Sequence, residues 1–319
     1  MTITNDYNID DIFIRLHDRY NADRQKSLEA REDGDPWDNT ISVTELINPV
    51  QITILKQHYS DQCAKDINDL IPSILGNAVH EALANTKSEQ SYSETRLYTG
   101  VDGLVLSGQP DRIFKEQNTH RSFKNTGLVS VKDAWAIQDY KFTGAYSTYH
   151  HKREWEEQLN CYAYLCKEGK TARGGGLEVD INHLFVTAIV RDWNHNNRGR
   201  DGYPDSWVVD IEIPLWSHEE QKNFISNKVS EYQKALEQFK TTNQLPECSD
   251  EERWSSGGGF AVMKPKRKTA VKLFNSETEA QEYSTTIPDS YVETRTIKYT
   301  RCDRYCDVSK FCNQIMEQK

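Results

Sequence analysis

The sequence contains no hydrophobic run long enough to cross a membrane as a helix, because its most apolar stretch, residues 184–190, has only the length of a strand. The first ten residues are polar and acidic and do not have the composition of a secretory signal. These two absences favour a cytoplasmic protein and argue against a membrane as a partner.

Motifs of several enzyme classes are also missing. Neither His-Glu-x-x-His nor Gly-x-Ser-x-Gly occurs. Gly169-Lys170-Thr171 has the ending of a P-loop, but Tyr164 stands where that motif requires Gly. Nucleotide binding by this route is therefore excluded, and any helicase or recombination protein that works with this chain must be a separate protein.

Positive charge is scarce. The 319 residues carry a net charge of −10, which argues against a general nucleic-acid coat. An enzyme that binds DNA at one site needs only a basic patch on its surface. Two short basic stretches exist, at 150–153 and 264–272. Taken alone, each stretch is more simply interpreted as solvated surface than as a DNA contact.

The hydrophobic pattern alternates between helical and strand periods, which predicts an α/β fold. Ser42 and Glu45 have the spacing of a capping box and mark the start of a helical stretch. We expect three regions: a charged N-terminal helix or arm at 1–41, a core at 42–245, and a C-terminal subdomain at 246–319. Within the core, the expected strands are 97–99, 103–107, 112–114, 134–140, 181–190 and 207–213, and the later expected helices are 154–168 and 219–240.

Four segments of the expected core carry residues suited to metal chemistry. In chain order they are Gly76-x-x-x-His80 in a helix, Gly108-x-Pro110-Asp111 at a turn entering a strand, Asp139-x-Lys141 in an apolar strand, and Gln158-x-x-x-Tyr162 on the next helix. Each is weak alone, since an Asp after Pro is commonly a turn residue and a lone His in a helix is commonly structural. The strand period of two, however, places the side chains of Asp139 and Lys141 on one face of an otherwise apolar strand.

These residue types suit phosphodiester hydrolysis. An imidazole and two carboxylates can bind a divalent cation, which polarises a phosphate and lowers the pKa of its bound water. Mg²⁺ prefers carboxylate oxygens, and the nitrogen of His80 also suits Mn²⁺. Lys141 can orient water or stabilise developing negative charge. Arg112, Lys152 and Arg153 are weaker candidates for phosphate contacts.

The four segments in this order resemble the PD-(D/E)XK nuclease superfamily, in its RecB-like exonuclease branch, over roughly residues 42–213. The resemblance implies a restriction-endonuclease-like fold, a mixed central β-sheet flanked by helices. It also implies His80, Asp111 and Asp139 as metal ligands and Lys141 as the catalytic lysine. Gln158 and Tyr162 would support the site or contact DNA. The implied activity is that of a Mg²⁺- or Mn²⁺-dependent deoxyribonuclease that acts on single-stranded DNA or duplex ends. The alternative is a catalytically silent DNA-binding or structural protein on the same fold.

Three of the seven cysteines, Cys302, Cys306 and Cys312, lie in the last eighteen residues at a spacing typical of metal ligands. A tetrahedral zinc site or a four-iron cluster needs a fourth ligand. Cys248, in an expected loop, is favoured over Cys63, in an expected helix. We expect Cys161 and Cys166 to be core residues.

RecB-like nucleases that hold a 4Fe-4S cluster are similar at their C-terminus, and this resemblance favours iron–sulfur over Zn²⁺. Their fourth cysteine usually lies ahead of the Gly-x-x-x-His motif, near the equivalent of Asn48, and this chain has no cysteine there. The expected cluster would tie a cysteine-rich C-terminal tail to the rest of the protein.

Overall fold

The structure is a computed structural model that describes residues 2–29, 39–86, 91–116, 119–131, 133–150 and 152–316. It is a mixed α/β protein with two compact units. Unit 1 comprises Met1–Asn48 and Ala64–Asn243, and unit 2 comprises Pro49–Cys63 and Gln244–Lys319.

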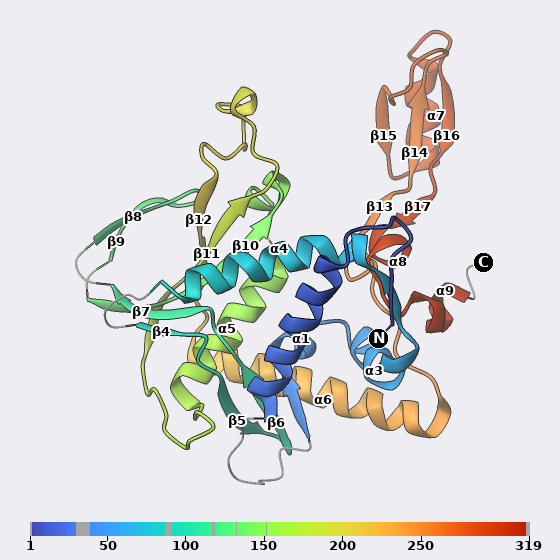
Figure 1. Ribbon diagram of the computed structural model, residues 1–319. Helices are drawn as coiled ribbons and strands as arrows, with labels where there is room; N and C mark the ends of the chain where they lie inside the picture. Colours follow the sequence, from blue (N-terminus) through green and yellow to red (C-terminus); the bar gives the residue numbers. More distant parts are fainter. Residues whose placement is uncertain are drawn as a thin grey trace. The chain divides into compact units, whose positions relative to one another are not determined.

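A five-stranded mixed sheet forms the framework of unit 1 (Figure 1). Its strand order is β12-β11-β10-β7-β4, and only the pair β10–β11 is parallel. The parallel pairing requires a crossover, which helix α5 supplies between the two strands. The strands are β4 (Ser91–Ser93), β7 (Arg112–Glu116), β10 (Ala134–Thr143), β11 (Ile181–Val190) and β12 (Val208–Ile213).

Helix α5 (Arg153–Glu168) packs its apolar side on this sheet because Leu159, Tyr162 and Leu165 recur at helical spacing. Cys161 and Cys166 are at most 1% exposed and belong to the same core, which confirms that prediction. Helix α6 (His218–Thr242) adds Ile225 and Val229 to the core and begins with a capping box at Ser217.

A second sheet of unit 1 has the order β2-β6-β5, with β2 (Thr40–Ser42), β5 (Leu97–Val101) and β6 (Leu104–Gly108). It leads into the short helix α2 (Val43–Leu46), where the predicted capping box of Ser42 and Glu45 is present. The expected strands near 97–114 are present and lie in two different sheets. Gly108-Gln109-Pro110 separates them, so that β6 pairs with β5 whereas β7 pairs with β10.

Helix α4 (Ile67–Ala84) packs against α1 (Ile12–Glu29) through Ile67, Leu70 and Ile74. The short strand β1 (Thr2–Thr4) pairs in parallel with β3 (Ala64–Asp66). The N-terminal segment, which we expected as a region of its own with a charged helix or arm at 1–41, does contain the helix α1 and is part of unit 1. The hairpin of β8 (Thr119–Phe123) and β9 (Gly127–Val131) completes the strands of this unit.

Unit 2 contains a three-stranded sheet of order β15-β14-β16, packed on helix α7 (orange in Figure 1). Its elements are β14 (Phe260–Met263), β15 (Lys272–Phe274), α7 (Glu277–Thr285) and β16 (Tyr291–Thr294). Strands β13 (Ser255–Gly257) and β17 (Ile297–Tyr299) pair with each other ahead of α8 (Thr300–Arg304), the turn η4 (Ser309–Phe311) and α9 (Asn313–Met316).

Residues 49–63 belong to unit 2, whereas the expected boundaries placed them inside a core at 42–245. They form α3 (Val50–His58) and the turn η1 (Ser60–Gln62). The physical reason is packing, because Ile52 and Leu55 of α3 line a cavity with residues of the C-terminal segment, and the Tyr59 ring stacks on Phe311 with centroids 4.1 Å apart. Residues 49–63 were expected in the core only because they follow Ser42–Leu46 closely in the sequence.

Among the described residues, none of the helices combines the length and the apolar character that crossing a bilayer requires.

Candidate functional site

Helix α4 and the turn before β7 bring His80 and Asp111 together. His80 lies in the last two turns of α4, and its Nδ1 is 3.3 Å from Asp111 Oδ1. The Pro110-Asp111 turn ends as β7 begins, which directs the Asp111 carboxylate out of the strand pairing. Both side chains are partly buried, so their interaction is only partly screened by solvent.

The other oxygen of Asp111 contacts the strand that carries the Asp-x-Lys segment. The backbone N–H of Tyr140 donates a hydrogen bond of 2.7 Å to Asp111 Oδ2. Tyr140 lies between Asp139 and Lys141 on β10. The Asp111 carboxylate therefore joins α4 to the middle of β10, and three segments far apart in sequence meet at one place.

Asp139 and Lys141 continue this chain of contacts toward α5. Asp139 is only 2% exposed, and its Oδ2 is 2.6 Å from Lys141 Nζ. Lys141 Nζ also donates to Gln158 Oε1 at 3.1 Å, and Gln158 Nε2 donates to the Tyr162 hydroxyl at 2.9 Å. The period of two in β10 and the spacing of four on α5 account for this alignment.

Glu94 is a functional candidate that sequence reasoning missed. It occupies the turn after β4 with a positive φ of 49°, and its backbone N–H donates to the Asp111 carbonyl at 3.2 Å. One ligand atom from each of His80, Glu94 and Asp111 lies within 4.8 Å of the other two. Ser93-Glu94-Thr95 carries no motif, so the only signal was an acidic residue between two short strands.

The group of three differs from the ligand set that we expected. Asp139 was expected to join His80 and Asp111, but its Oδ2 is paired with Lys141, and Glu94 completes the group instead. Asp139 still interacts electrostatically with His80 and Asp111. Asp139 therefore lies beside the group as a further carboxylate.

The local charges shift several pKa values. Burial raises the pKa of Glu94 to about 7, and the negative charge of Asp111 adds to this effect. Burial also raises the pKa of Asp139, although the Lys141 ammonium opposes that rise. For His80, burial lowers the pKa, but the hydrogen bond and charge of Asp111, together with the charge of Asp139, outweigh burial, and the net pKa is raised. Both burial and the mutual repulsion of neighbouring carboxylates therefore disfavour their ionised forms at this place.

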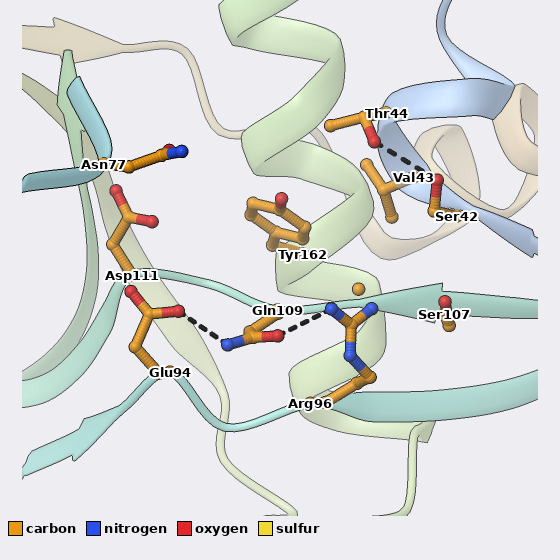
Figure 2. A pocket seen from close by; sticks show the side chains of 11 residues that line it. Ser42, Val43, Thr44, Asn77, Glu94, Arg96, Ser107, Gln109, Asp111 and Tyr162 are labelled. Carbon is orange, nitrogen blue, oxygen red and sulfur yellow. Dashed lines mark hydrogen bonds between the residues drawn. The ribbon is translucent and has the colours of Figure 1, made fainter. Parts of the chain in front are cut away.

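A cavity of about 500 Å³ opens beside Glu94 and Asp111 (Figure 2). Glu94 accepts a hydrogen bond from Gln109 Nε2 at 2.6 Å, and Gln109 Oε1 accepts one from Arg96 Nη2 at 2.6 Å. Asn77, from the Gly76–His80 segment, and Tyr162 line the same cavity. The cavity thus combines carboxylates on one side with a guanidinium on the other.

Of the weaker phosphate candidates, the two arginines are engaged within the protein, whereas Lys152 lies beside an aromatic ring. Arg112 donates to Gln138 Oε1 at 2.9 Å and lies over the Phe114 ring, 4.0 Å from its centroid. Arg153 pairs with Glu157 at 2.7 Å. Lys152 Nζ lies 5.8 Å from the centroid of the Tyr146 ring.

In unit 2, all four expected cluster ligands line one cavity, namely Cys248, Cys302, Cys306 and Cys312. The thiols of Cys248 and Cys312 lie 3.3 and 3.5 Å from Gln51 Oε1. Burial raises the pKa of Cys248 to about 12 and also raises the pKa values of Cys306 and Cys312. Cys63 is buried but is not among the residues that line this cavity.

No family model and no curated protein matches the chain. Among solved structures, the chain is similar to the one described as "Crystal structure of SSO0001", with 16% sequence identity and a TM-score of 0.39 over 65% of this chain and 82% of that chain. A likeness this low adds nothing to the interpretation of the site, which depends on the geometry of its own residues.

Proposed function

We propose that this protein is a metal-dependent DNA nuclease, an exonuclease in its mode of action, that hydrolyses phosphodiester bonds at the site of His80, Asp111, Asp139 and Lys141. The observation that carries the proposal is the Asp111 carboxylate, which lies 3.3 Å from His80 Nδ1 and accepts a hydrogen bond from the Tyr140 backbone between Asp139 and Lys141. A helix, a turn and a strand thus contribute charged groups to one place, and a purely structural scaffold has no need of such a gathering.

The finer assignment of the fold is part of the same proposal. A mixed sheet whose central strand carries Asp-x-Lys, with a helix bearing Gln-x-x-x-Tyr directly after that strand, agrees with a restriction-endonuclease-like core in the RecB-like branch. Asp139 and Lys141 share one face of β10, and Lys141 bonds to Gln158 on α5. The proposal extends to DNA as a partner and to a separate helicase or recombination protein.

The donor set fits a hard divalent cation. His80, Glu94 and Asp111 offer one nitrogen and two carboxylates, and the raised pKa of Glu94 would be relieved by a neighbouring positive charge. We propose that these three residues hold Mg²⁺ or Mn²⁺, with Asp139 as an adjoining carboxylate. When bound, the ion would supply Lewis-acid polarisation of the phosphate and acidification of a water.

The residues of the chain have distinct roles in this account. Lys141, held by Asp139 and Gln158, orients the attacking water or neutralises charge that develops on the phosphate oxygens. Gln158 and Tyr162 keep the ammonium of Lys141 in position through their hydrogen bond. Arg96 lines the cavity opposite Asp111 and can receive the phosphate of a bound strand.

For unit 2 we propose a 4Fe-4S cluster bound by Cys248, Cys302, Cys306 and Cys312, with Zn²⁺ as the alternative. Four soft sulfur donors line one cavity, and sulfur is the donor that either group takes. Thiols whose pKa is raised by burial are protonated at neutral pH, so binding would release protons. A bound group would join α3 to the C-terminal segment, since Gln51 contacts two of the cysteines.

A cleavage assay tests the nuclease proposal. Labelled single- and double-stranded DNA is incubated with the wild-type protein in Mg²⁺ or Mn²⁺, and with Lys141→Met. Removing one charge-stabilising group is expected to slow cleavage by about 10²–10³-fold while DNA binding is retained. Lys167→Met, an exposed lysine on the same helix as Gln158, is the matched control and should cleave normally.

Absence of cleavage by the wild-type protein with either metal, together with retained DNA binding, would instead support the silent DNA-binding protein. Equal cleavage rates for Lys141→Met and the wild-type protein would show that Lys141 has no role in the mechanism.

A further inference from the structure

The connection between β10 and α5 carries a group of ring side chains that the proposed chemistry does not use. Tyr146, in the turn η2 (Ala145–Thr148), lies with Tyr149 and His150 just beyond it. The Tyr146 and His150 rings are stacked with centroids 3.9 Å apart, and the Tyr149 centroid lies 5.6 Å from that of Tyr146. We call these three residues the aromatic cluster.

The aromatic cluster is exposed although its backbone is held firmly. Tyr146 is 59% exposed and Tyr149 is 44% exposed. The Ala145 N–H donates to Asp192 Oδ1 at 2.7 Å, and the Thr148 hydroxyl donates to the Ala145 carbonyl at 2.8 Å. Anchored backbone with rings left in solvent is typical of a surface prepared for a partner.

Two lysines accompany the aromatic cluster. Lys152 Nζ lies 5.8 Å from the Tyr146 centroid, and Lys124 Nζ lies 5.8 Å from the Tyr149 centroid. Lys124 also donates to the Gly202 carbonyl at 2.8 Å. In a chain with a net charge of −10, rings flanked by cations form a local site suited to an anionic aromatic ligand.

The position of the aromatic cluster links it to the proposed nuclease site. Tyr146 follows Lys141 by five residues, which limits their separation along an extended chain to about 18 Å. Lys152 precedes Gln158 on α5 by six residues. The aromatic cluster therefore occupies the loop that joins the two elements bearing Lys141 and Gln158.

We propose that the aromatic cluster is a platform on which unpaired bases of single-stranded DNA stack, while Lys124 and Lys152 contact the phosphates. The inference rests on the proposed nuclease function and narrows its substrate class to DNA with a single-stranded segment. Exposed rings bind the faces of bases without sequence preference, whereas the base faces of an intact duplex are already stacked on one another.

A binding measurement without cleavage tests the platform separately from catalysis. Fluorescence anisotropy in the presence of EDTA compares an oligothymidylate with the same strand annealed to oligoadenylate. Tyr146→Ala and Tyr149→Ala are each expected to weaken binding of the single strand by about 5- to 150-fold, which is the usual cost of losing one stacked base. Tyr146→Phe keeps a ring and should keep the affinity.

Tyr7→Ala is the matched control, because Tyr7 is 70% exposed in the same unit and lies between β1 and α1. A 2-aminopurine base in the oligonucleotide reports stacking directly, and its fluorescence should respond to wild type and Tyr146→Phe but not to Tyr146→Ala. Thermal unfolding of each variant verifies that the fold is kept.

The outcomes separate the two proposals. Unchanged single-strand affinity in both alanine variants, or no preference of the wild type for the single strand, overturns the platform whether or not the protein cleaves DNA. Stacking and ring-dependent affinity in a protein that cleaves nothing with Mg²⁺ or Mn²⁺ would support the platform and refute the nuclease. Loss of affinity in Tyr7→Ala to the same degree would also overturn the platform.

Discussion

At the scale of single residues, the main result is the arrangement of charge around Asp111. Its two oxygens face different partners, His80 Nδ1 at 3.3 Å and the Tyr140 N–H at 2.7 Å. The pairing of Asp139 and Lys141 on one strand face could be predicted from the period of two alone. Glu94 could not be predicted, because its place beside Asp111 depends on a positive-φ turn whose neighbours give no motif.

The first prediction at this scale concerns Glu94 as a metal ligand. Glu94→Gln removes one carboxylate from the group of three. It should lower Mn²⁺ affinity by at least about tenfold, because losing even a residue that only hydrogen-bonds to a metal ligand lowers affinity by about that factor. Isothermal titration calorimetry measures the affinity. Glu154→Gln, an exposed glutamate on α5, is the control, and equal affinities in the two variants would exclude Glu94 as a ligand.

The second prediction concerns pH. The pKa of Glu94 is raised from 4.5 to about 7 in the folded protein, so between these values the folded state binds more protons than the unfolded state. The free energy of unfolding of the metal-free protein should therefore fall as the pH rises from 4.5 to 7. The raised pKa of His80 acts in the same direction, because its contribution is present below 6.5 and is lost as the pH rises through the folded value.

Urea unfolding in EDTA across this pH range measures the effect, and Glu94→Gln should make the decline shallower. Glu94 is exposed as a whole residue although it lines the cavity, so its loss of solvation is only partial and the change will be modest. An identical decline in both proteins would show that Glu94 does not titrate as described.

At the scale of elements, the position of α5 relative to β6 depends on Gly108. A Cβ placed on Gly108 would lie 2.5 Å from Leu165 Cδ1 and 2.9 Å from Tyr162 Cε1, and both of these side chains are buried. The Gly of the Gly-x-Pro-Asp segment therefore has a packing role that brings Tyr162 to the site. Strand and helix periods predicted most elements, but periodicity does not say which strands pair. The pairing of β5 with β6 and of β7 with β10 could therefore not be predicted from the sequence.

The third prediction compares two glycines. Gly108→Ala should lower the free energy of unfolding by about 1–3 kcal/mol because the core must shift. Gly76→Ala should raise it by roughly 1 kcal/mol, since Gly76 lies within α4 with open space around its added methyl group and Ala is the better helix former. Chemical denaturation measures both, and the account fails if the two substitutions have the same sign.

At the scale of the whole molecule, the chain divides into two units, and each unit is built from two separate stretches of the sequence. The three late cysteines could be interpreted as ligands from their spacing, and Cys248 from its place in a loop. Residues 49–63 could not be assigned to unit 2, because that assignment depends on contacts of α3 with the segment that follows position 244.

The fourth prediction concerns the cysteine cavity. Cys248→Ala should lose most of the bound cluster, because three thiolates leave one position without a ligand, whereas Cys63→Ala should retain it. Iron, sulfide and zinc content and the visible absorbance of anaerobically purified protein measure the outcome. Stoichiometric zinc in colourless protein would select the alternative, and equal metal content in both variants would contradict the role of Cys248.

The most direct test of the central claim is to locate the cation itself. Crystals grown with Mn²⁺ give an anomalous difference map, and the account predicts a manganese peak bounded by His80, Glu94 and Asp111, on the same side of β10 as Lys141. A map without density among these residues, obtained at manganese concentrations that support cleavage, would contradict the account.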